Sequence, residues 1–126
     1  MITEDYVSFE TAKLLKEKGF TANIHGMYDH DGKFCEATFT NVEPYYSCYA
    51  PTLQMAMKWL REVHKIGVFP STYAFMVGEN GSAKPVYGTA IINLETYKLM
   101  TYDLMPMPTY EEATEAAIKY CLENLI

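Results

Sequence analysis

Six side chains of this chain are suited to act as a nucleophile, a base or a metal ligand: His25, His30, His64, Cys35, Cys48 and Cys121. A cysteine becomes a nucleophile when a neighbouring imidazole takes its proton. His64 and Cys121 fall on the apolar sides of two expected helices, so packing of both helices on one sheet would bring them close. An apolar helix face does not lower a thiol pKa, and free cysteines are among the most buried residues. We therefore predict an inert, buried Cys121 and no catalytic residue; a small enzyme or ligand-binding domain that uses His64 or a cysteine is the alternative.

Two short segments have the residue types of ligand-binding loops without their spacing. Asp29-His30-Asp31-Gly32 starts like a calcium loop, but it lacks the further acidic ligand and the distal glutamate. The glycine-rich segment 78–82 lacks the Gly-Lys-Ser/Thr ending of a phosphate loop. Both segments are typical of tight turns, and no Cys-x-x-Cys pair indicates a zinc site. The sequence therefore predicts neither a metal nor a cofactor.

The composition is typical of one soluble globular domain over residues 1–126, with 49% hydrophobic and 21% charged residues. A formal net charge of −6 is opposite in sign to the surface that binds nucleic acid, so nucleic acid is not the expected partner. The first residues lack the basic region and apolar core of a signal peptide, and no apolar run is long enough to span a membrane. Three cysteines do not form a disulfide framework. We expect a cytoplasmic protein with reduced thiols.

Three helices are predicted, over residues 8–18, 52–65 and 109–125. Ser8 and Thr109 are N-cap residues, and Gly19 is a left-handed stop after the first helix. The central helix starts at Pro51, and its apolar face, extended by Trp59, is much wider than that of an ordinary surface helix. We therefore expect the fold to pack around the central helix, which should be the most buried helix and should bury Trp59.

Alternating apolar residues and turn signals predict strands over residues 23–29, 33–40, 45–49, 72–77, 86–93 and 97–102. The first two form a hairpin through a type I′ turn at Asp31-Gly32, with Cys35 on the buried face. The fourth and fifth flank the turn at residues 78–82. The predicted fold class is α+β: an antiparallel sheet of about five or six strands in two strand–helix halves, with the three helices on one face.

Two groups of residues are candidates for contact with a partner. The first is the tyrosine cluster, made of Tyr45, Tyr46 and Tyr49. One face of a short strand cannot bury all three rings, and exposed aromatic side chains are enriched at protein interfaces. The second is the basic stripe of the central helix, made of Lys58, Arg61 and Lys65. We interpret the basic stripe as a solvated helix face, with weak nucleic-acid binding as an alternative, and we predict a protein partner or self-association through the tyrosine cluster.

Three stretches, residues 6–20, 50–64 and 109–126, resemble a group of short uncharacterised proteins of gut anaerobic bacteria and their phages or other mobile elements. That group has no assigned activity, so the resemblance implies no catalytic residue and no cofactor. It implies a small accessory protein rather than a metabolic enzyme. Together with the acidic composition, it predicts a non-enzymatic protein-interaction module of phage or mobile-element origin.

Overall fold

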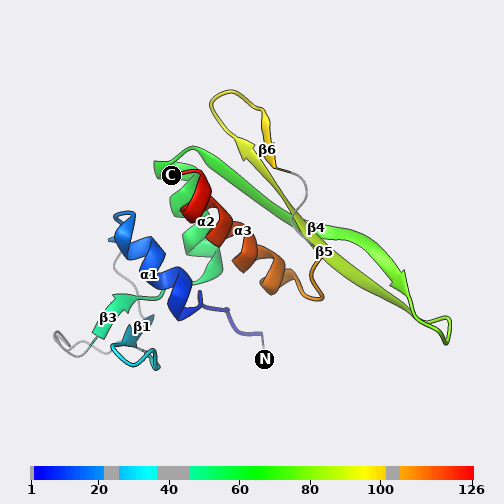
Figure 1. The fold of residues 1–126 in the computed structure, drawn as a ribbon, viewed down its shortest axis with the longest axis horizontal. Helices are drawn as coiled ribbons and strands as arrows, with labels where there is room; N and C mark the ends of the chain where they lie inside the picture. The colour runs from blue at the N-terminus through cyan, green and yellow to red at the C-terminus, as the bar shows by residue number, and fades with distance from the viewer. Residues whose placement is uncertain (1, 22–25, 37–45, 102–105) are drawn as a thin grey trace.

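Three helices and six strands form an α+β fold in the computed structural model, which describes residues 2–21, 26–36, 46–101 and 106–126 (Figure 1). In chain order they are α1 (Phe9–Glu17), β1 (Gly26–Asp29), β2 (Phe34–Glu36), β3 (Tyr46–Tyr49), α2 (Leu53–Val63), β4 (Ile66–Val77), β5 (Ala83–Asn93), β6 (Leu99–Thr101) and α3 (Tyr110–Asn124). The predicted α+β class, the three helices and the antiparallel pairing are confirmed.

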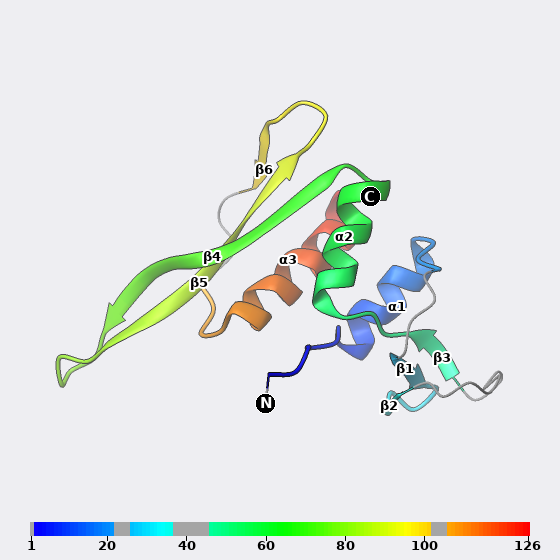
Figure 2. The ribbon, with the colours of Figure 1, turned by 180° about the vertical axis from the view of Figure 1, so that it is seen from behind.

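The strands form two antiparallel sheets of three strands each, not one continuous sheet. The small sheet has the order β2-β1-β3, and the large sheet has the order β4-β5-β6, so the two halves differ in which strand is central. Helices α2 and α3 pack against the large sheet, while α1 contacts α3 and β3. The helices therefore lie between the two sheets, as Figures 1 and 2 show, and do not cover one face of a single sheet.

Short polar side chains and one glycine set the ends of the helices. The N-caps are Ser8, Thr52 and Thr109, and each side-chain oxygen accepts a hydrogen bond from the N–H three residues later. After α1, Gly19 has a φ of 93°, and the N–H of Phe20 donates to the carbonyl of Leu15 at 2.9 Å. This is the predicted Schellman ending. Pro51 precedes the N-cap of α2 and is not in its first turn; its carbonyl accepts the N–H of Val7 at 3.0 Å.

A single hydrophobic core is built from all three helices and from both sheets. Helix α3 contributes six buried residues and α2 contributes four, so the central helix is not the most buried one. On α2, Met55 and Val63 are exposed, and Trp59 is only partly buried, with its ring edge-on to Phe20 at 5.6 Å. The apolar arc of α2 is therefore wider than the surface that α3 and β4 cover.

The β1–β2 hairpin has a three-residue loop at 30–32 in place of the predicted type I′ turn. The N–H of Gly32 donates to the carbonyl of Asp29 at 3.1 Å, and Gly32 is the loop residue with a positive φ, 83°. A type I turn followed by a left-handed glycine has this pattern, whereas type I′ needs two positive φ values. The Asp29 carboxylate stabilises the loop because it accepts the N–H groups of Asp31 and Lys33 at 2.9 Å.

Cys35, which was predicted on the buried face of the hairpin, is exposed. Its cross-strand partner Met27 is buried, but β2 forms the edge of the small sheet, beyond the elements that cover Met27. The predicted hairpin also includes residues 23–25, with His25, and residues 37–40, which lie outside the described part of the chain.

The backbone of β1 comes close to the segment that leads into α2. A Cβ atom added at Gly26 would lie 2.7 Å from the carbonyl oxygen of Ala50. Only glycine fits there, because that oxygen belongs to the backbone and cannot rotate away. A Cβ at Gly67 of β4 would instead meet the ring of Phe69, a half-exposed side chain that can move.

The β4–β5 hairpin is longer than predicted and is the most extended feature of the fold. Its pairing runs from Ile66↔Asn93 to Val77↔Ala83, with a register shift between Thr72 and Ala74. A bulge of this kind bends and twists a strand. The part beyond the bulge, residues 74–86, extends away from the helices in both views, and we call it the arm (Figures 1 and 2).

Candidate functional site

A groove of about 860 Å³ lies between the arm and the beginning of α3. Its lining includes apolar, aromatic and charged side chains: Val77, Lys84, Val86, Tyr87, Tyr110 and Glu111. The volume is within the range of about 300–1,000 Å³ that is common for binding sites. The groove was not predicted from the sequence, because its existence depends on the length and direction of the arm.

Two tyrosines hold the arm against α3 at the closed end of the groove. The rings of Tyr87 and Tyr110 meet edge to face, with centroids 6.3 Å apart. The backbone N–H and carbonyl of Tyr87 are both paired with Met107 at 2.8 Å. Val86 is 8% exposed and closes the groove, whereas Val77, near the end of the arm, is 73% exposed. The groove therefore has a fixed inner end and an open outer end, where the exposed Val77 lies among the polar lining residues Asn80 and Ser82.

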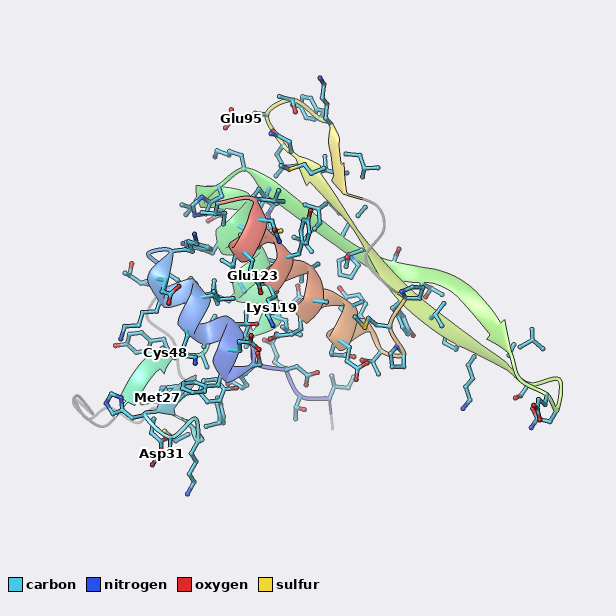
Figure 3. All side chains as sticks on the ribbon, in the orientation of Figure 1. Met27, Asp31, Cys48, Glu95, Lys119 and Glu123 are labelled. Carbon is cyan, nitrogen blue, oxygen red and sulfur yellow. The ribbon has the colours of Figure 1, made fainter. Side chains whose placement is uncertain are left out.

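The groove contains one positive and one negative side chain that the fold does not use. Lys84 projects from the arm and Glu111 from the first turn of α3; both are exposed. Neither has an ion-pair partner among the described residues. The ion pairs of the helices are elsewhere: Lys119 of α3 contacts Glu10 of α1 at 2.8 Å, which links the two helices, and Glu123 within α3 at 3.8 Å. Lys119 and Glu123 are labelled in Figure 3.

The carboxylate of Glu115 also links α3 to α1. It accepts hydrogen bonds from the backbone N–H of Ser8, at 3.0 Å, and from the Ser8 hydroxyl. Ser8 is the N-cap of α1, and a negative charge at a helix N-terminus is favourable. The contact makes Glu115 part of the fold.

Proline limits strand addition along both edges of the β4–β5 hairpin. The N–H and carbonyl of Tyr87 point outward to Met107, so alternate residues of β5, including Pro85, also face the outer edge. By the same register, Pro70 opposite Thr89 faces the outer edge of β4. Each proline removes one donor from an edge, which disfavours pairing with a further strand. A partner in the groove would therefore bind mainly through side chains.

Cys121 and His64, which the alternative of a small enzyme would use, both lie in packed surroundings. Cys121 is fully buried, and burial raises the pKa of its thiol to about 12, so the thiol stays protonated at neutral pH. His64 packs edge to face against Trp59 at 4.6 Å, and its buried Nε2 has no hydrogen-bond partner in the described part of the chain. No histidine or cysteine lines the groove.

The two predicted contact groups lie away from the groove. All three residues of the basic stripe are exposed, but only Lys58 and Arg61 lie on α2. Lys65 follows the C-cap His64 with a φ of 56°, and its ammonium donates to the carbonyl of Glu62 at 3.0 Å. In the tyrosine cluster, Tyr49 is partly buried in β3, Tyr45 lies outside the described residues, and only the backbone of Tyr46 is described. The contact role of the tyrosine cluster therefore stays a prediction.

Comparison with family models, with curated proteins and with solved structures finds no match to this chain. Within residues 2–21, 26–36, 46–101 and 106–126, no three acidic, histidine or cysteine side chains are grouped to hold a metal ion. None of the helices in these ranges is long and apolar enough to cross a membrane. The arm and its groove are thus the strongest candidate for a functional surface.

Proposed function

We propose that this chain is a small non-enzymatic module that binds a protein partner in the groove between the arm and α3. The observation that carries the proposal is the arm itself. The arm leaves Val77 in solvent beside a groove of mixed apolar and charged lining. Interfaces are commonly built from an apolar centre with aromatic side chains and a polar rim. In the groove, Tyr87 and Tyr110 are the aromatic side chains, and Lys84 and Glu111 are the charged ones.

The likeness to short proteins of gut anaerobes and their phages supports an accessory role in a phage or another mobile element. Cys35, Cys48 and Cys121 form no disulfide in the described part of the chain, and such reduced thiols support a reducing, cytoplasmic location. The raised thiol pKa of Cys121 argues against an enzyme that uses this residue, because a protonated, buried thiol is a poor nucleophile.

Site-specific cross-linking tests the proposal. A photo-reactive benzoylphenylalanine in place of Val77 is compared with the same residue in place of Tyr97, which is 83% exposed in the β5–β6 turn. In an extract of the cells that make the protein, we expect one discrete adduct from position 77 and none from position 97. Mass spectrometry of the adduct then identifies the partner. Equal labelling from both positions, or no adduct from position 77, would contradict the proposal.

The exposed basic stripe favours weak nucleic-acid binding as a second candidate function. Two cations on α2 and a third just after its C-cap could contact neighbouring phosphates, with strong dependence on salt. A gel-retardation assay at low salt, with the wild type and a triple alanine variant of the basic stripe, tests it. Binding that both proteins share equally would exclude the basic stripe as its source.

A further inference from the structure

We propose that the partner in the groove is a second copy of this chain, in a two-fold symmetric dimer in which Lys84 of each copy pairs with Glu111 of the other. This inference rests on the proposed function, since it names the partner for the same groove. The proposed interface is formed by the arm and α3 and does not include the tyrosine cluster.

The charges of the groove favour a second copy over a strongly charged partner. The chain has a net charge of −6, so a cationic protein would be attracted to its whole surface, whereas two copies repel each other except where opposite charges meet. Lys84 and Glu111 line the same groove, exposed and without ion-pair partners among the described residues. A partner that satisfies both must present an anion and a cation in the reverse order. A two-fold axis through the groove presents that arrangement, because an isologous interface brings the same surface patch of both copies together.

The apolar part of the groove is also self-complementary. Val77 is exposed at the outer end of the arm, and Val86 and Tyr87 form the inner wall. Two arms that run in opposite directions would place Val77 of one copy over the inner wall of the other. Pro85 removes a donor from the β5 edge that faces the groove, so side-chain packing, not a continuous sheet, would join the arms. Such an interface has closed two-fold symmetry, so assembly stops at the dimer.

Charge reversal in two separate variants tests this arrangement without reference to an unknown partner. Lys84→Glu places four negative charges in the interface of its own dimer, and Glu111→Lys places four positive charges there. Each variant alone should therefore dimerise at least about tenfold more weakly than the wild type, since like charges across an interface repel. An equal mixture restores both opposite-charge pairs across the two-fold axis, so it should form a mixed dimer with wild-type affinity. Sedimentation equilibrium measures the mass, twice 14.4 kDa for the dimer.

Lys98→Glu and Glu95→Lys are the matched controls, because both residues are exposed between β5 and β6 and neither lines the groove; Glu95 is labelled in Figure 3. They should leave the dimer unchanged. Circular dichroism verifies that each variant is folded, and Lys84→Gln with Glu111→Gln replaces any variant that is not. A monomeric wild type, or single reversals without effect, would overturn the dimer. Loss of the dimer in both variants without recovery in the mixture would overturn the two-fold pairing. A position-77 adduct with a different protein would overturn self-association and leave the proposed function standing.

Discussion

Replacing Cys121 by alanine should remove a specific loss of stability at alkaline pH. The thiol is buried in α3, and burial raises its pKa to about 12 from an ordinary value of 9.0. Below pH 9 the thiol is neutral in the folded and unfolded states, so it causes no pH dependence. Between about pH 9 and 12 the unfolded chain loses the proton while the folded chain keeps it, and the free energy of unfolding falls.

The magnitude follows from the difference between the two pKa values. Each pH unit in this window should cost the wild type about 1.4 kcal/mol relative to the alanine variant, or about 2 kcal/mol at pH 10.5. At neutral pH the wild type should be the more stable protein, because Cys121→Ala leaves a small cavity that costs about 1 kcal/mol of stability.

Urea unfolding at pH 7.5, 9 and 10.5, followed by circular dichroism, measures the effect. The eleven tyrosines also ionise in this range, but they are common to both proteins, so the difference between wild type and Cys121→Ala isolates the thiol. The control Cys35→Ala removes an exposed thiol and should retain the wild-type slope. Parallel slopes for wild type and Cys121→Ala would refute the reasoning, and so would rapid thiol labelling of Cys121 in the folded protein.

Three further predictions concern packing and charge. Gly26→Ala should cost about 1–3 kcal/mol of stability, because its methyl group meets a backbone carbonyl. Gly67→Ala should cost less, because only mobile side chains lie close to its added methyl group. Thermal unfolding compares the two variants, and equal losses of stability would contradict the prediction. Trp59→Ala should cost about 2–3 kcal/mol, below the value for a fully buried tryptophan, and the native fluorescence maximum should lie between those of buried and exposed indole. Lys119 lowers the pKa of Glu10, so Glu10→Gln should destabilise the protein at neutral pH and lose its effect as the pH falls below the usual carboxylate range; an effect that persists at pH 2 would count against the ion pair.

Local signals in the sequence were sufficient for the helices. Ser8 and Thr109 cap α1 and α3, and Gly19 ends α1, because each acts through hydrogen bonds within a few residues. The thiol of Cys121 was placed correctly for a similar reason, since its helical position alone puts it on the apolar side of α3. These features depend on neighbours in the chain, which a sequence displays directly.

Features that depend on distant segments were not predictable in the same way. The apolar arc of α2 is a property of its own sequence, but the exposure of Val63 depends on how far α3 and β4 extend over it. The single expected sheet is two sheets because the helices pack between them. The groove was missed because neither the bulge after Thr72 nor the direction of the arm has a signal in local periodicity. The predicted turn at residues 78–82 was the feature of the sequence that came closest to indicating the arm.

The links from α3 to α1 also constrain the order in which the chain can acquire structure during synthesis. Glu115 and Ser8 are 107 residues apart in the chain, and α1 has only nine residues, too few for a stable isolated helix. While a ribosome is still making the large sheet, α1 lacks both the carboxylate at its N-cap and the ammonium that pairs with Glu10. Its first turn gains these two contacts only after α3 has left the exit tunnel, so the packing of α1 is completed late although α1 is synthesised before the other two helices. Nascent chains arrested before residue 110 should accordingly show rapid amide exchange in α1, and chains released after α3 should show protection there.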